Sequence, residues 1–255
     1  MAHPTALALE YHLVSYRRTW RASVFSSFAL PAMFLVAMGI TVGHYIDERS
    51  TAIGVPYLDY LGPGLLASTA LQVAVGDSTW PVFSGFNWTR IYHSMRASPL
   101  TVGDMLRGHL LFVTLRVGLS AAGFLVVLLL FGALHSWWAV LTPLVSVLLG
   151  AACAAPCFAF AARAESDGAF AVLFRVAVVP MTLFAGVFFP VESLPVPARL
   201  LAWVSPLWHG VELSRAATLG TATAWGLPAH VAVLVLWCGV GYVLALRSFT
   251  RKLGD

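Results

Sequence analysis

The sequence contains 255 residues, of which 59% are hydrophobic and only 10% are charged. Soluble domains carry about 25% charged residues, so this composition excludes an ordinary soluble protein. The formal net charge of +4 is typical of basic residues at the rims of membrane helices, and we expect no nucleic-acid partner. The predicted fold class is an all-α integral membrane protein that contacts the lipid bilayer.

The first part of the chain predicts a helix that lies on the membrane surface. Within residues 3–20, Leu9, Leu13, Tyr16 and Trp20 recur every three or four positions and form one apolar face. Arginines project from the opposite face, as in interfacial helices that bury their apolar side in the lipid. The alternative is a disordered N-terminal tail.

Six apolar segments follow, with lengths that suit the roughly 20 residues needed to cross a bilayer as a helix. The expected transmembrane helices cover residues 23–43, 60–83, 105–132, 138–162, 169–189 and 227–247. The second segment is the least apolar of the six, and a re-entrant element is the alternative there.

The distribution of basic residues predicts the orientation. Arginines occur in the N-terminal arm, in the loop after the second segment and near the C-terminus, whereas the 44–59 loop is mainly acidic. Cytoplasmic loops of membrane proteins are enriched in lysine and arginine. We therefore expect both termini to lie in the cytoplasm.

A polar stretch, GFNWTRIYHSMRASPL, separates the second and third apolar segments. Residues 87–96 of this stretch follow the spacing of an amphipathic helix. The apolar face would be formed by Trp88, Ile91, Tyr92 and Met95, and the polar face by Arg90, His93 and Ser94. Two interpretations stay open: an anchor among lipid headgroups, or a docking surface for a cytoplasmic protein, where aromatic residues and arginine are common anchors.

Local signals define the ends of this short helix. Asn87 is expected to cap its N-terminus. Pro99 disfavours helical geometry at Ser98 and therefore ends the helix. Thr101 stands three residues before Asp104, which predicts a capping box at the start of the third apolar helix.

Three ionisable residues lie within the proposed spans, namely Asp77, Arg116 and Arg175. Charged side chains are costly inside a bilayer and usually face a partner or a water-filled interior. These residues could form an ion pair, line a substrate path, or extend to the membrane interface.

A proline-rich segment precedes the last span. In residues 190–219, Pro197 and Pro206 can each begin a helix that is too short to cross the bilayer. We expect two re-entrant helices that dip into the membrane from the outside. The residues of this segment that suit the membrane interface are Trp203, Trp208 and His209.

Catalysis is not expected in this chain. A P-loop requires a lysine after a glycine-rich turn, and the only lysine is Lys252, near the C-terminus. Neither an HExxH nor a GxSxG pattern occurs. Cys153, Cys157 and Cys238 lie in apolar segments without a histidine or acid at metal-ligand spacing, so no metal site is expected.

Two stretches of the sequence resemble the type-2 ABC transporter permease family. The first, GPGLLASTALQVAVGDSTWPVFSGFNWTRIYHSMRASPLTVGD, is most similar to the branch of nodulation-factor (lipooligosaccharide) exporter permeases. The second, FAGVFFPVESLPVPARLLAWVSPLWHGVELSRAATLG, resembles the segment before the last span in the broader family. With the six-span layout, the resemblance covers nearly the whole chain.

This resemblance implies one transmembrane domain over residues 1–255 in a bacterial inner membrane. It implies a second permease copy or paralogue and two cytoplasmic ABC ATPase subunits, which would bind ATP and magnesium, with no cofactor in this chain. The helix at 87–96 would be the coupling helix that enters a groove in the ATPase, and the two re-entrant helices would close the outer side of the path. The coupling residues would be Asn87, Trp88, Arg90, Tyr92, His93 and Arg96.

The function implied by the resemblance is ATP-driven export of an amphipathic substrate, either a lipooligosaccharide or a lipid-linked glycan. Efflux of a drug or antibiotic, as in sister branches of the family, is one alternative. An ion-coupled secondary transporter is another, but it predicts discontinuous helices at the membrane midplane and an internal repeat, for which the sequence gives no convincing sign.

Overall fold

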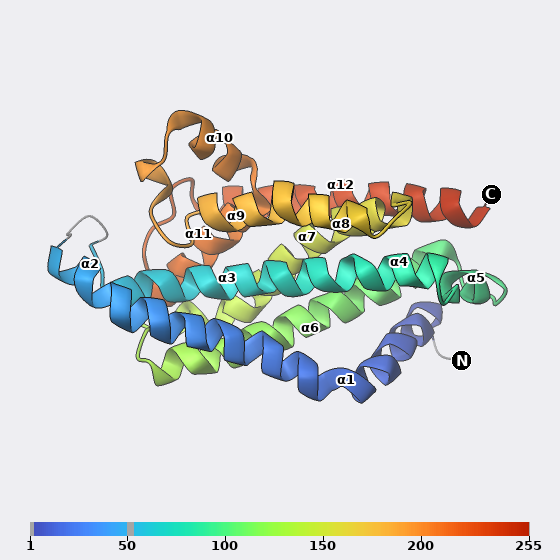
Figure 1. The fold of residues 1–255 in the computed structure, drawn as a ribbon, viewed down its shortest axis with the longest axis horizontal. Coiled ribbons are helices and arrows are strands. Elements are labelled where there is room, and N and C mark those ends of the chain that lie inside the picture. The colour runs from blue at the N-terminus through green and yellow to red at the C-terminus, as the bar shows by residue number, and fades with distance from the viewer. Residues whose placement is uncertain (1–2, 50–53, 255) are drawn as a thin grey trace.

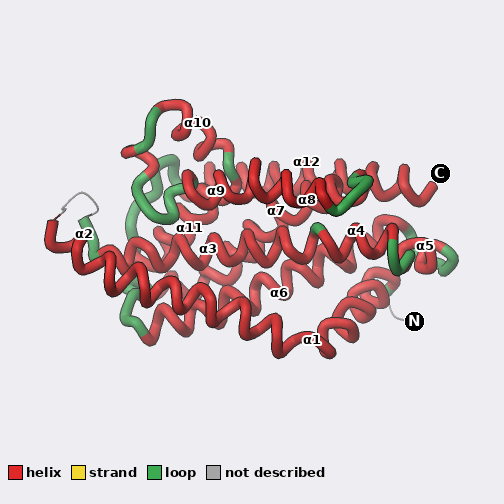
Figure 2. The backbone as a smooth tube through the Cα atoms, in the orientation of Figure 1, coloured by secondary structure: helices red, strands yellow, loops and turns green. Residues whose placement is uncertain are grey.

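The computed structural model describes residues 3–49 and 54–254, and every regular element within these ranges is helical (Figure 2). The elements are α1 (Pro4–Phe34), η1 (Leu35–Val42), α2 (Gly43–Arg49), α3 (Tyr57–Ser78), α4 (Trp80–Asn87), α5 (Ile91–Arg96), α6 (Val102–Leu130), η2 (Trp137–Leu141), α7 (Thr142–Arg163), α8 (Gly168–Leu173), η3 (Phe174–Val178), α9 (Val179–Phe184), η4 (Val191–Ser193), α10 (Val196–Val204), α11 (Pro206–Leu219) and α12 (Leu227–Gly254). The predicted all-α class is confirmed for this part of the chain.

The long helices run side by side along the long axis of the molecule (Figure 1). Helix α7 packs against α3, α6 and α12, α6 also contacts α3 and α12, and α12 follows α7 over much of its length. Helix α5 and both ends of the chain lie at one end of this bundle, which we call the α5 end, while α2 and α10 lie at the other (Figure 1).

Within the described residues, three helical stretches are long and apolar enough to cross a membrane. They are Val102–Leu130, Trp137–Arg163 and Leu227–Gly254, and a shorter apolar stretch covers Gly168–Phe184. Large apolar side chains such as Leu130, Val140 and Leu236 are exposed on their surfaces, as expected for contact with lipid. The protein is therefore a membrane protein, and the division into six spans stays a prediction.

Helix α1 differs from the division expected from the sequence. One helix runs from Pro4 to Phe34, where an interfacial helix at 3–20 and a separate span at 23–43 were expected. No proline or glycine interrupts the sequence between the two segments, so nothing local ends the first helix. The helix bends instead: its N-terminal part lies at the α5 end, and the rest runs toward α2 (Figure 1).

The second apolar segment also differs, because the helix is interrupted at Thr79. Helix α3 ends at Ser78, and α4 begins at Trp80 with Pro81 in its first turn. Proline is disfavoured inside a helix because it lacks an N–H, but it fits the first turn of a new one. The expected segment at 60–83 is therefore shared between two helices.

Two glycines permit close approach between pairs of helices. A Cβ added to Gly108 of α6 would lie 2.5 Å from Cβ of Ala8 in α1. A Cβ added to Gly241 of α12 would lie 2.6 Å from Cδ of Pro156 in α7. Small residues bring membrane helices into direct backbone contact, so larger side chains here would separate both pairs.

Candidate docking surface around helix α5

Helix α5 is shorter than the helix predicted at 87–96. It spans Ile91–Arg96, and Arg90 in front of it has a left-handed backbone with φ 52°. Asn87 does not cap α5: it is the last residue of α4, where its Nδ2 donates to the carbonyl oxygen of Phe83 at 3.0 Å. Helix α4 therefore takes up the start of the predicted range, and the chain turns at Arg90 before α5 begins.

Five of the six predicted coupling residues are exposed, namely Asn87, Trp88, Arg90, His93 and Arg96. Trp88 is 62% exposed although it is a large aromatic residue. Tyr92 is the exception, because only 1% of its surface is accessible. We call the five exposed residues the α5 face. It combines an aromatic ring with two arginines and contains no acidic residue.

Tyr92 holds α5 against the bundle. Its hydroxyl is hydrogen-bonded to Nδ1 of His109 at 2.7 Å, and its ring packs on those of Phe86 and Phe249, with centroids 4.6 and 5.2 Å away. Burial raises the pKa of Tyr92, so the phenol stays protonated at pH 7. The lack of a side chain at Gly85 makes room, since a Cβ there would lie 2.5 Å from the Tyr92 ring.

The N-terminal part of α1 also packs on His109. The His12 ring stacks on the His109 ring with centroids 3.9 Å apart and 24° between the planes. Thr5 Oγ1 donates to Asp104 Oδ1 at 2.9 Å. Burial lowers the pKa of His12 to about 4, so the stacked imidazole is neutral at pH 7. His109 of α6 thus contacts both α1 and α5.

The predicted capping box at the start of α6 is confirmed. The backbone N–H of Asp104 donates to Thr101 Oγ1 at 3.1 Å, and the backbone N–H of Thr101 donates to Asp104 Oδ2 at 3.2 Å. Both interactions satisfy donors that an uncapped helix would leave without partners. The capping box gives α6 a fixed starting point directly after α5.

Of the three charged residues predicted inside the spans, Asp77 and Arg116 form an ion pair and Arg175 does not join it. Arg116 Nη1 of α6 donates to Asp77 Oδ1 of α3, and each side chain is about one-seventh exposed. The guanidinium of Arg116 also lies over the Tyr16 ring of α1, 4.8 Å from its centroid. The ion-pair interpretation therefore holds for Asp77 and Arg116. Arg175 in η3 is exposed and forms no ion pair with a described residue.

Comparison with known proteins identifies the family. The profile of the ABC-2 type transporter family matches residues 5–219, which is most of the chain. The chain belongs to this family. It is therefore the permease type of ABC transporter subunit, and the resemblance found in the sequence is confirmed.

The curated relatives agree on one branch of the family. The permease is 27% identical over 241 residues to Nodulation protein J of Rhizobium leguminosarum bv. viciae, which covers 94% of this chain and 91% of the relative. It is 26% identical to Nodulation protein J of Sinorhizobium fredii and 25% identical to that of Rhizobium meliloti, in each case over 94% of this chain and 90% of the relative. The matches include the α5 region and the segment before α12.

At the other end of the permease, the predicted residues Trp203, Trp208 and His209 gather in one aromatic cluster. His209 Nε2 donates to the carbonyl oxygen of Trp203 at 2.9 Å, and its Nδ1 lies 2.8 Å from Nδ1 of His230. Trp225 packs against Trp208 with centroids 4.9 Å apart. The sequence interpretation missed Trp225 and His230, although both flank the start of the last apolar helix, where interfacial aromatic residues are common.

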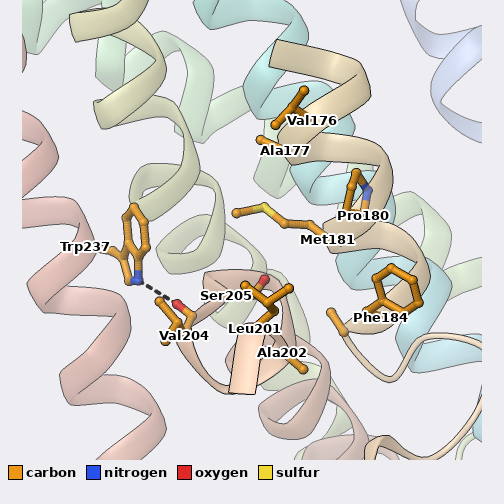
Figure 3. A pocket seen from close by; sticks show the side chains of 11 residues that line it. Val176, Ala177, Pro180, Met181, Phe184, Leu201, Ala202, Val204, Ser205 and Trp237 are labelled. Atoms are coloured by element: carbon orange, nitrogen blue, oxygen red, sulfur yellow. Dashed lines mark hydrogen bonds between the residues drawn. The ribbon is translucent and has the colours of Figure 1, made fainter. Parts of the chain in front are cut away.

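The two short helices predicted at 190–219 are present as α10 and α11, with Pro197 and Pro206 in their first turns. Beside α10, the permease contains an apolar pocket of about 260 Å³ (Figure 3). The residues that line it include Val176, Pro180, Met181, Phe184, Leu201 and Trp237.

Hydrogen bonds already engage the polar groups of this pocket. Trp237 Nε1 donates to the carbonyl oxygen of Val204 at 3.1 Å, drawn as the dashed line in Figure 3. Ser205 Oγ accepts from the backbone N–H of Leu207 at 3.2 Å. The remaining surface is hydrocarbon, so the pocket suits an apolar group.

Proposed function

We propose that this permease is the membrane subunit of an ATP-driven exporter and that the α5 face docks on a cytoplasmic ABC ATPase. Docking is supported by the contrast between buried and exposed residues in α5 and in the turn before it. Tyr92 is buried and bonded to His109, whereas Trp88, Arg90 and Arg96 remain exposed. Aromatic residues and arginine are the usual anchors of protein interfaces.

The same anchoring suits transmission of movement. A push on the α5 face reaches α6 through the Tyr92–His109 bond and α1 through the His12–His109 stack. Helices packed this closely move together, because a dense core resists local deformation. Closure of the ATPase would then change the arrangement of the helices that enclose the cargo path.

The proposed assembly contains two permease subunits, which are identical or paralogous, and two ATPase subunits in a bacterial inner membrane. ATP and magnesium would bind to the ATPase subunits, since this chain has no P-loop lysine. The whole chain would form one transmembrane domain of six spans, with both termini and α5 in the cytoplasm. Helices α10 and α11, with Trp203, Trp208 and His209, would close the outer side of the path.

The proposed cargo is amphipathic, either a lipooligosaccharide or a lipid-linked glycan. Similarity to Nodulation protein J supports this choice, and the apolar pocket beside α10 provides a surface that accepts a hydrocarbon chain. Efflux of a hydrophobic drug is the second candidate, because the same pocket would serve a compound without any sugar.

Reversal of two charges on the α5 face tests the docking proposal. We expect Arg90→Glu with Arg96→Glu to abolish ATP-dependent transport and to prevent copurification of the ATPase, while the chain still inserts in the membrane. Arg247→Glu is the matched control, since Arg247 is exposed near the same end of the bundle but lies on α12. Normal transport in the double variant would instead assign the α5 face to lipid headgroups.

A further inference from the structure

A groove at the α5 end is lined mainly by the ends of α7 and α12 and shares one residue, Asn87, with the α5 face. It consists of two adjoining open hollows of about 570 and 680 Å³, which share Arg163, Ala164 and Glu165. The shared residues belong to the last turn of α7 and to the connection that leads into α8. The two hollows therefore form one continuous groove.

One half of the groove is polar and basic. Its basic residues are Arg163, Arg251 and Lys252, beside Asn87 and a single acid, Glu165. No carboxylate in the described part of the chain pairs with any of these three cations. The Nζ of Lys252 lies 5.1 Å from the centroid of the Phe86 ring. Unpaired basic groups at a bundle end form a suitable site for an anion.

The other half of the groove is apolar and continues along the membrane helices. Its lining includes Pro156, Ala159 and Phe160 of α7 and Leu244 of α12. Phe160 and Leu244 are 37% and 38% exposed in their positions along the groove. From Leu244 to Lys252 the rise along α12 is about 12 Å. The apolar half and the basic half therefore follow one another along α12 and join at Arg163, Ala164 and Glu165.

We propose that this groove binds one anionic phospholipid. The phosphate lies among Arg163, Arg251 and Lys252, and an acyl chain follows Phe160 and Leu244 into the hydrocarbon region. Basic pockets between membrane helices recognise anionic headgroups in this way. A segment of a water-soluble protein is a poorer match, because it would have to follow the apolar half along helices that face lipid.

Lipid titration of the purified full-length chain tests the proposal. Native mass spectrometry measures the affinity of the chain for phosphatidylglycerol and for phosphatidylcholine with the same acyl chains. We expect tighter binding of phosphatidylglycerol, and about 30-fold weaker binding of it to the Arg251→Gln/Lys252→Gln variant, since two cations are removed. The unfolding temperature in phosphatidylcholine shows whether the variant is folded.

The matched control is Arg247→Gln, which removes an exposed cation on the same helix that does not line the groove. We expect this variant to bind phosphatidylglycerol like the natural chain. A loss in Arg247→Gln that equals the loss per removed charge in the double variant would show nonspecific attraction to the basic end and overturn the proposal. So would equal binding of the two lipids by the natural chain.

Two competition experiments separate the lipid from other occupants. Soluble glycerophosphoglycerol in excess should not displace phosphatidylglycerol, because it cannot occupy the apolar half. Displacement would reduce the site to one for a free phosphate group. Displacement by the ATPase partner would identify the groove as a protein interface, and either result would refute the lipid assignment. Both results leave the exporter proposal intact, because the α5 face is tested by different variants.

Discussion

The hydrogen bond between Tyr92 and His109 offers a direct test of how α5 is anchored. Tyr92→Phe removes one hydroxyl and keeps the ring that packs on Phe86 and Phe249. Both bonded residues are 1% exposed, so Nδ1 of His109 would lose its partner without gaining water. A buried polar atom left without a partner costs about 1–3 kcal/mol.

The assay has two parts. Thermal unfolding of the purified permease, followed by tryptophan fluorescence, should show a lower unfolding temperature for Tyr92→Phe. Transport by the complete complex should fall while the ATPase still copurifies, because the α5 face itself is unchanged. Tyr242→Phe is the control, since Tyr242 is a partly buried tyrosine of α12. If Tyr92→Phe has the same unfolding temperature and the same transport rate as the unsubstituted permease, the proposed anchoring role is refuted.

Three further predictions concern α1, α3 and α6 of the permease. Thr101→Ala should destabilise the start of α6 by about 1 kcal/mol, seen as faster amide exchange in its first turn. Asp77→Asn should lower stability by about 3–5 kcal/mol because Arg116 keeps a buried charge, and the added change Arg116→Gln should recover part of this loss in the same unfolding assay. Protonation of His12 should release the N-terminal arm from the bundle. The pKa of His12 is about 4, below the usual 6.5, because the ring is buried. The docked arm is therefore most stable above pH 6.5, and its stability falls as the pH falls toward 4. The rate of proteolysis of the arm, measured across this pH range, would report its release. A rate that depends on pH no more than the rate in His12→Phe would contradict the prediction.

The features that the sequence predicted well depend on neighbouring residues. The Thr101–Asp104 capping box is one, because both residues lie within a single turn. The starts of α10 and α11 are another, since each is set by a proline in its first turn. Local rules of this kind do not depend on the rest of the fold.

The features that the sequence did not predict depend on contacts between distant segments. Periodicity placed Tyr92 on the apolar face of a helix but could not distinguish contact with lipid from contact with protein. His12 and His109 are scattered in the sequence, and only the fold of α1 along α6 stacks them. His209 and His230 are also distant in the sequence, and only the fold of α11 against α12 brings their rings together. The break at Arg90 was missed because the amphipathic spacing continues through the turn.

The most direct test of the central claim is to identify the neighbour of the α5 face in the native membrane. A photo-crosslinking amino acid placed at the exposed residue His93 should capture a P-loop ATPase. The same amino acid at Trp138, which is 66% exposed in η2 after the far end of α6, should not capture it. Crosslinks from His93 to lipid alone, in a complex that still transports, would contradict the account.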